Sequence, residues 1–353
     1  MPSPIETRAN PPNRFERVHV AEMPELGFGA SHEDPPEDPR TELLVDPSRT
    51  IVASNDSPDV GFAASVNPYR GCAHGCAYCF ARPTHEYLGY SAGLDFSTKI
   101  LVKPRAAELL RKQLLSPSWK PQVLAMSGVT DPYQPAERRL RITRGCLEVL
   151  AEFKNPVAIV TKGFLVTRDA DLLAELARAN AAAVMISLTT LDAELQRKME
   201  PLASPPSKRL AAIEALARAG VPVGVMAAPT IPGLTDHELP AILQAAASAG
   251  ASSAGFVVLR LPHGVKELFA DWLSEHFPER REKVLNRLRA LHGGALYDSR
   301  YAHRQRGAGE FAAQIEALFE LGRKRAGLAR RGPELSTAAF RRPGVVDQLS
   351  LFR

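Results

Sequence analysis

The sequence predicts an α/β fold built around a parallel β-sheet. Six short apolar runs, rich in β-branched residues, alternate with helical patterns, and the connections between them are short. The runs are almost continuously apolar, which is typical of parallel strands buried on both faces. They cover residues 64–67, 122–127, 157–161, 183–189, 222–227 and 255–260. An open doubly wound sheet and a curled partial barrel both satisfy this pattern.

Helical patterns fill the intervals between these strands. They cover residues 105–115, 137–153, 169–179, 207–219 and 235–249. Thr235 and Glu238 have the spacing of a capping box, so we expect the last of these helices to begin at Thr235. After residue 260 the strand patterns stop, and residues 264–292 and 308–326 are predicted to be helices packed on the sheet domain.

The two ends of the 353-residue chain differ from its body in composition. Nine of the 29 prolines lie in the first 50 residues among acidic and small polar residues, and such a stretch buries little apolar area. We therefore expect residues 1–45 to be disordered. The core domain is expected over residues 46–262, a helical extension over 263–326, and a loose basic tail over 327–353.

Composition and charge exclude several classes of protein. The hydrophobic content of 45% with 24% charged residues is that of a globular protein. No apolar run approaches the roughly 18 residues of a membrane span, and the first residues lack the apolar core of a signal peptide, so we expect a cytoplasmic protein without a membrane partner. The net charge of +5 is unevenly distributed along the chain, because residues 280–353 include 16 basic and 7 acidic residues. This basic quarter fits contact with a polyanion such as DNA, or a solvated helical surface.

Three of the four cysteines, Cys72, Cys76 and Cys79, fall within eight residues, and Cys146 stands alone in a helical pattern. Such grouping in a cytosolic protein suggests a metal site more than disulfides. A structural zinc site needs four ligands, and a second cysteine pair is missing. A [4Fe-4S] cluster held by three thiolates would leave one iron open to a further ligand. Cys146 is expected to be a small buried thiol.

The C-x3-C-x2-C spacing, with Tyr78 before the last cysteine, resembles the signature of the radical S-adenosylmethionine superfamily. The resemblance implies a partial (β/α)6 TIM-like barrel with a C-terminal helical extension. It also implies a [4Fe-4S] cluster on Cys72, Cys76 and Cys79, whose open iron binds S-adenosylmethionine. An electron from an external donor of the flavodoxin or ferredoxin type then cleaves this cofactor to methionine and a 5′-deoxyadenosyl radical, which abstracts hydrogen from a substrate.

The remaining cofactor contacts are expected at the carboxyl ends of the strands, where parallel α/β folds bind ligands. The resemblance implies contacts from Tyr78, Ser127, Gly128, Lys162, Ser187 and Thr189. Lys162 is expected to pair with the methionine carboxylate as a point charge. The catalytic group is not identified by the sequence. Its candidates are Tyr133, Tyr301 and Cys146.

The runs NPYRGC, DPYQPAE, TKGFLVTRD, MEPLASPPSKRL and APTIPGLTD resemble the spore photoproduct lyase-like branch of the superfamily. That lyase reverses a thymine dimer in DNA, and a protein cysteine returns a hydrogen atom. The resemblance implies a lyase-like, DNA-repair-like reaction on a nucleic acid or nucleotide, although Ser127 stands near the position of the donor cysteine. The alternatives are a structural metal-binding module in a DNA-replication or repair complex, and a radical enzyme acting on RNA or protein.

The last residues of the chain resemble the short peptide with which bacterial DNA-replication and repair proteins dock on the sliding clamp. Leu349, Leu351 and Phe352 would fill hydrophobic pockets, and the amide of Gln348 would fix the register. The alternative is a tail that folds back on its own barrel.

Overall fold

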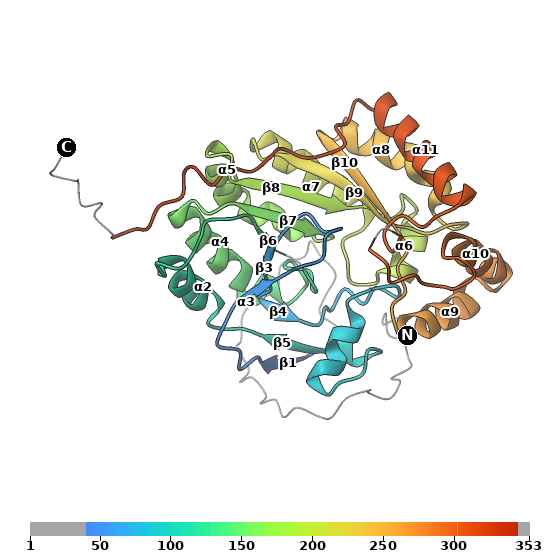
Figure 1. Cartoon of the computed structure of the whole chain (residues 1–353), viewed down its shortest axis with the longest axis horizontal. Coiled ribbons are helices and arrows are strands. Elements are labelled where there is room, and N and C mark those ends of the chain that lie inside the picture. The colour runs from blue at the N-terminus through green and yellow to red at the C-terminus, as the bar shows by residue number, and fades with distance from the viewer. Residues whose placement is uncertain (1–39, 127, 302, 345–353) are drawn as a thin grey trace.

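A computed structural model describes residues 40–126, 128–301 and 303–344 (Figure 1). Among these residues, seven strands form one sheet in the order β10-β9-β8-β7-β6-β3-β2, and all neighbours are parallel except β2, which is antiparallel to β3. The strands are β2 (Val52–Ser54), β3 (Ala64–Val66), β6 (Leu124–Met126), β7 (Val157–Thr161), β8 (Ala182–Ser187), β9 (Val223–Thr230) and β10 (Ser253–Val258). The predicted parallel sheet is confirmed. Because the six parallel strands follow in chain order without a reversal, the sheet is wound in one direction, as in a barrel and not a doubly wound sheet.

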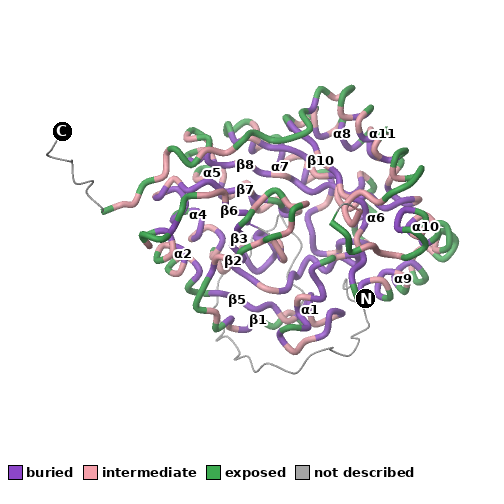
Figure 2. The backbone as a smooth tube through the Cα atoms, viewed as in Figure 1, coloured by how far each residue is buried: buried purple, intermediate pink, exposed green. Residues whose placement is uncertain are grey.

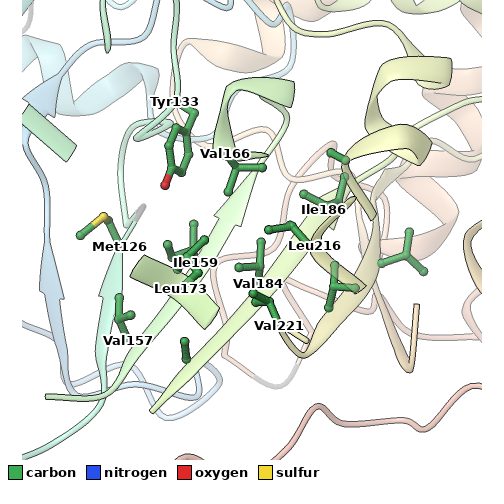
Figure 3. Packing of buried hydrophobic residues seen from close by; sticks show 14 of the residues in the cluster. Met126, Tyr133, Val157, Ile159, Val166, Leu173, Val184, Ile186, Leu216 and Val221 are labelled. Atoms are coloured by element: carbon green, nitrogen blue, oxygen red, sulfur yellow. The ribbon is translucent and has the colours of Figure 1, made fainter. Parts of the chain in front are cut away.

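In the described residues, each connection between successive parallel strands contains one long helix that flanks the sheet (Figure 1). These helices are α2 (Ala106–Leu115), α4 (Ile142–Phe153), α5 (Ala170–Arg178), α7 (Pro206–Arg218) and α8 (Leu239–Ser248). The core lies between these helices and the strands. Figure 3 shows Ile159 of β7 and Val184 of β8 beside Leu173 and Leu216 of the covering helices. Buried residues accordingly concentrate along the strands and the inward faces of the helices (Figure 2).

Two predicted helices are each divided in two. The helix expected over 137–153 breaks at Arg141, whose φ of 53° is left-handed, into α3 (Glu137–Leu140) and α4. The helix expected over 264–292 breaks at Phe277 into α9 (Val265–His276) and α10 (Pro278–Leu291). Pro278 cannot donate a backbone hydrogen bond, so it begins a new helix instead of continuing the old one.

The predicted capping box at Thr235 and Glu238 is wrong. The short 3-10 helix η3 (Asp236–Glu238) precedes α8 at this point, and no side chain caps it. The Glu238 carboxylate instead accepts hydrogen bonds from the Thr190 hydroxyl (2.7 Å) and the Leu191 backbone (2.7 Å). A long-range partner therefore takes the carboxylate that the local motif would have used.

A second, three-stranded sheet in the order β1-β5-β4 was not predicted. It contains β1 (Glu42–Val45), β4 (Tyr69–Arg70) and β5 (Lys99–Val102), and it lies beside the 3-10 helix η1 (Arg82–Leu88) and α1 (Asp95–Thr98). Strand β1 falls within residues 1–45, which were expected to be disordered. The apolar residues of β1 pair in parallel with β5, and Leu44 is buried, so the ordered chain begins earlier than expected. Residues 1–39 lie outside the described residues.

The C-terminal helices pack on the barrel in two different ways. Helices α9 and α10 enclose an apolar cluster that includes Phe269 and Trp272 and extends to Cys76 and Tyr78. Helix α11 (Glu310–Arg325) packs on α8, and its Phe319 lies 4.6 Å from Phe256 of β10, measured between ring centroids. The short helix α6 (Ala193–Met199) follows β8. None of the described helices is long and apolar enough to span a membrane.

Residues 328–344, expected to belong to a loose tail, form an extended segment fixed to the barrel, which we call the strap. Ala329 pairs with Ser253 at the edge of β10, and the side chain of Asn180 donates to the Glu334 carbonyl (2.9 Å). Farther along, the guanidinium of Arg342 donates to three carbonyls between α2 and β6, those of Leu114, Ser116 and Trp119. All these contacts lie where helices end and strands begin, which is the amino-terminal end of the barrel.

Candidate active site

The three clustered cysteines lie in one buried loop, residues 71–79, which we call the cysteine loop. It follows β3 and β4 and therefore lies at the carboxyl ends of the barrel strands. Gly71 opens the loop with a φ of +78°, and a Cβ atom there would lie 2.9 Å from both the His85 ring and the Phe96 carbonyl oxygen. Glycine is therefore required at this turn. The Cys72 backbone then donates to Phe96 (2.9 Å) and fixes the start of the loop.

Arg82 holds the inside of the cysteine loop together. Its side chain is fully buried, and its guanidinium donates to the carbonyls of Cys76 (2.9 Å), Gly75 (3.2 Å) and Gly93 (2.6 Å). These bonds satisfy backbone carbonyls inside the loop, of which that of Cys76 also accepts from the Cys79 backbone (3.3 Å). Arg82 was not singled out from the sequence, since nothing in its local pattern distinguishes it from a surface arginine.

The thiols of the cysteine loop share one electrostatic environment. Burial raises the pKa of the Cys76 thiol, and Lys162 acts in the opposite direction. Burial likewise raises the pKa of Cys79, against Arg82 and Lys162, and Cys72 acts on both thiols. Binding of a metal group would release the thiol protons and remove this burial cost.

Lys162 comes from the end of β7 and is directed toward the cysteine loop. Its ammonium lies 5.7 Å from the centre of the Tyr78 ring. Within the described part of the chain this ammonium has no hydrogen-bond or ion-pair partner. A half-buried cation without a partner, next to three thiols, can receive an anionic ligand.

Tyr78 belongs to a buried network that sequence reasoning missed. Its hydroxyl donates to the carboxylate of Glu200, which also accepts from the Thr189 hydroxyl (2.7 Å) and forms an ion pair with Arg209. Glu200 and Arg209 are almost fully buried. Burial disfavours the charged carboxylate, but Arg209 and then Lys162 outweigh it and lower the pKa of Glu200 to about 2. Tyr78 and Thr189 are thus fixed in position through Glu200.

Asp131 joins the end of β7 to the cysteine loop. Its carboxylate accepts from the Thr161 hydroxyl (2.6 Å) and the Lys162 backbone (2.8 Å), and it lies 3.4 Å from Nδ1 of His74. Burial opposes ionisation, but His74 and these donors lower the pKa of Asp131 to about 2. The ionised carboxylate therefore links the end of β7 to the cysteine loop.

The other predicted cofactor contacts lie at neighbouring strand ends. The Gly128 backbone donates to the side chain of Asn67 (3.1 Å), so Asn67 joins the ends of β3 and β6. The Ser187 hydroxyl donates to the Ala228 carbonyl (2.9 Å) between β8 and β9. Ser127 lies outside the described residues.

The three catalytic candidates occupy different surroundings. Cys146 is completely buried in the main core, where burial raises its pKa well above the usual range. Tyr133 is also buried, and Figure 3 shows its ring between Met126 and Val166. Tyr301 is 48% exposed, and the Arg304 guanidinium stacks on its ring at 4.6 Å. Cys146 therefore has the surroundings of a packing residue, whereas Tyr301 is accessible.

No three His, Cys, Asp or Glu side chains in the described part of the chain gather closely enough to hold a single metal ion. The donor set of three thiols is the one that iron–sulfur clusters use. A separate groove of about 540 Å³ between η3, α10 and α11 includes none of the predicted site residues.

The fold and the site together define a class: a singly wound parallel α/β barrel with a thiol-rich loop at its carboxyl end. The chain belongs to the radical SAM superfamily, because the model of that superfamily matches residues 66–246. It is a radical SAM enzyme. An uncharacterised protein of Mycobacterium tuberculosis (strain H37Rv) is 42% identical over 238 residues, which cover 67% of this chain and 69% of the relative. An uncharacterised protein of Methanocaldococcus jannaschii is 27% identical over 173 residues, which cover 49% of this chain and 62% of the relative.

Solved structures of spore photoproduct lyase share this fold. A cysteine-to-serine mutant of that lyase superposes with a TM-score of 0.58 at 18% identity, and the match covers 82% of this chain and 81% of the lyase. The lyase complexed with dinucleoside spore photoproduct gives a TM-score of 0.56 at 17% identity with the same coverage. These matches confirm the predicted partial barrel.

Proposed function

We propose that Cys72, Cys76 and Cys79 hold a [4Fe-4S] cluster whose open iron binds S-adenosylmethionine. One observation carries this proposal: three thiols, buried at Cys72 and Cys76 and half-buried at Cys79, share a single loop at the carboxyl ends of the strands, and the partnerless ammonium of Lys162 faces the same loop. When bound, the cluster supplies one electron that cleaves S-adenosylmethionine to methionine and a 5′-deoxyadenosyl radical. An external protein of the flavodoxin or ferredoxin type replaces that electron.

The residues of the site divide into those that contact the cofactor and those that position them. Lys162 receives the methionine carboxylate as a point charge. Gly128 and Ser187 provide small and polar surfaces at neighbouring strand ends. Tyr78 and Thr189 present their remaining atoms to the cofactor in an orientation fixed by Glu200.

We propose a nucleic acid or nucleotide as substrate, in a lyase-like reaction related to DNA repair. The support is the fold shared with an enzyme solved in complex with a dinucleoside photoproduct, together with the basic carboxy-terminal quarter of this chain. A clamp-docking peptide, Gln348, Leu349, Leu351 and Phe352, would bring the enzyme to DNA. These four residues lie outside the described residues.

The cofactor is tested by anaerobic reconstitution with iron and sulfide. We expect close to four irons per chain, an electron paramagnetic resonance signal that changes on adding S-adenosylmethionine, and formation of 5′-deoxyadenosine. Cys76→Ala should lose the iron and the product. Cys146→Ala is the matched control and should retain both, because its thiol lies in the core. Equal iron content in the two variants would contradict the assignment.

The substrate is tested with the reconstituted enzyme, S-adenosylmethionine and a reductant. Duplex DNA carrying thymine dimers, single-stranded DNA, RNA and a protein extract are compared by the 5′-deoxyadenosine formed and by mass changes in the polymer. Stimulation by DNA alone supports the proposal. Stimulation by RNA or protein alone would move the substrate to that class and leave the cofactor chemistry intact.

A further inference from the structure

Two exposed aromatic rings are each stacked against an arginine, and the first of these pairs adjoins the cysteine loop. Phe80 directly follows Cys79 and is 45% exposed, and the guanidinium of Arg260 lies 4.7 Å from its ring centre. Tyr301, with Arg304 on its ring, forms the second pair. We refer to these four residues as the rim.

The rim spans the two edges of the barrel sheet. Asp59 lies in the connection between the edge strand β2 and β3, and it forms an ion pair with Arg304. The neighbouring Gln305 donates to the Asp59 carbonyl (2.8 Å) and accepts from Val258 of β10, the other edge strand (2.9 Å). Arg304 and Gln305 therefore bridge the two edge strands across the open side of the barrel sheet.

Arg260 is the unsatisfied member of the rim. It follows β10 at its carboxyl end, and its Nε atom is buried without a hydrogen-bond partner. Within the described ranges its guanidinium makes no ion pair or hydrogen bond, although Asp59 is close enough to feel its charge. Arg304, by contrast, is neutralised by Asp59. An anionic group at the rim would satisfy the Arg260 donors.

The chemistry of the rim matches one kind of ligand. Rings and guanidinium planes that are exposed side by side bind unstacked nucleobases, and an arginine next to them binds the phosphate. An acidic peptide could use the charge of Arg260 but has no planar group for Phe80 and Tyr301. We propose that the rim is a nucleobase- and phosphate-binding site that holds one strand of a nucleic acid against the cysteine loop.

This inference rests on the proposed function, whose substrate the rim would hold, but its test does not need the cluster chemistry. Binding of a fluorescein-labelled twelve-nucleotide single-stranded DNA to the full-length chain is measured by anisotropy at several salt concentrations. We expect Phe80→Ala and Arg260→Ala each to weaken binding at least tenfold. Arg260→Lys, which keeps the charge but loses the planar stack, should fall between wild type and Arg260→Ala.

Two controls lie at the amino-terminal end of the barrel. Arg218→Ala removes an exposed arginine, and Leu115→Ala removes an exposed apolar side chain. Both should bind the oligonucleotide as the wild type does. Circular dichroism and thermal melting establish that every variant is folded.

Three results would contradict the proposal that the rim binds nucleic acid. They are no oligonucleotide binding by the wild type, equal binding by rim and control variants, or equally strong competition from polyglutamate. The proposed function fails separately. A wild-type chain that binds the oligonucleotide through the rim but forms no 5′-deoxyadenosine contradicts the proposed chemistry and leaves the rim intact. If the chain forms 5′-deoxyadenosine but the rim substitutions do not change its affinity for the oligonucleotide, only the proposed role of the rim is contradicted.

Discussion

The two ends of the barrel use polar residues in opposite ways. At the carboxyl end, charged side chains such as Arg82, Glu200 and Arg209 are buried and bonded to buried partners. At the amino-terminal end, charged pairs are exposed to solvent, as in Glu214 and Arg218 of α7. The carboxyl end of the barrel thus contains buried charged groups whose desolvation costs free energy, whereas the amino-terminal end is an ordinary solvated surface.

The strongest way to break this comparison is to remove a carboxylate from each end. Glu200→Ala leaves Arg209 buried without its partner, so we expect the free energy of unfolding to fall by about 3–5 kcal/mol. Glu214→Ala, which removes the exposed partner of Arg218, should cost about 0–1 kcal/mol. Urea unfolding followed by circular dichroism measures both values. Similar losses in the two variants would show that the ends do not differ in this way.

The acid dependence of stability sharpens the same contrast. The pKa of Glu200 is lowered from 4.5 to about 2 in the folded chain, chiefly by Arg209 against the opposing effect of burial. The stability that this ionisation provides is complete above the unfolded-state pKa and is lost as the pH falls toward 2. The free energy of unfolding should therefore fall more steeply between pH 5 and 2 in the wild type than in Glu200→Gln. If the free energy of unfolding changed with pH equally in the wild type and in Glu200→Gln, ionisation of Glu200 would not be the cause of the acid dependence.

Two glycines at opposite ends separate backbone strain from crowding. Gly71 and Gly220 have φ angles of +78° and +77°, but a Cβ at Gly71 would collide with His85 and Phe96, whereas nothing lies within 4 Å at Gly220. Gly220→Ala should cost about 1–2 kcal/mol from the left-handed conformation alone. Gly71→Ala should cost about 2–4 kcal/mol because overpacking is added. Equal midpoint shifts in urea would mean that the cysteine loop accommodates the methyl group.

How far the sequence predicts the molecule depends on the range of the interactions. The parallel strands and the cysteine loop were predictable, because each is encoded in a run of neighbouring residues. Glu200 was not predictable as a positioning residue, since its partner Tyr78 is 122 residues away and its own surroundings look like a helix-to-turn junction. The run MEPLASPPSKRL, which contains Glu200, contributed to the family resemblance but did not indicate a role for this residue. Strand β1 was missed because the acidic and proline-rich composition around it outweighed a few apolar residues. The strap was missed because its basic, Gly- and Pro-containing composition indicates a loose tail.

A smaller effect is expected from loosening the strap. Arg342→Ala removes three partly buried hydrogen bonds to backbone carbonyls, so stability should fall by about 1–2 kcal/mol. Formation of 5′-deoxyadenosine by the reconstituted enzyme should not change, since Arg342 lies at the end opposite the cysteine loop. Thermal melting and product analysis by mass spectrometry measure the two quantities. A loss of product at a temperature where the variant is fully folded would reveal communication between the ends.

The smallest effect on the barrel itself is expected from changing the last residues. Leu351→Ala together with Phe352→Ala should leave the melting temperature unchanged. Recovery of the chain on an immobilised bacterial sliding clamp should fall at least tenfold if Leu351 and Phe352 fill its pockets. Equal recovery of the variant and the wild type would rule out this docking peptide.

The strap also determines how the chain would respond to mechanical load. A partner that held the final residues would pull first on Arg342 and its three carbonyls at and after the end of α2. The bonds of Arg341 to the end of α4 and then the contacts of Asn180 would bear the load next. Force would therefore reach the barrel at the junctions that precede β6, β7 and β8, at the end away from the thiols. Tension on the carboxyl terminus would therefore leave the cysteine loop unstrained.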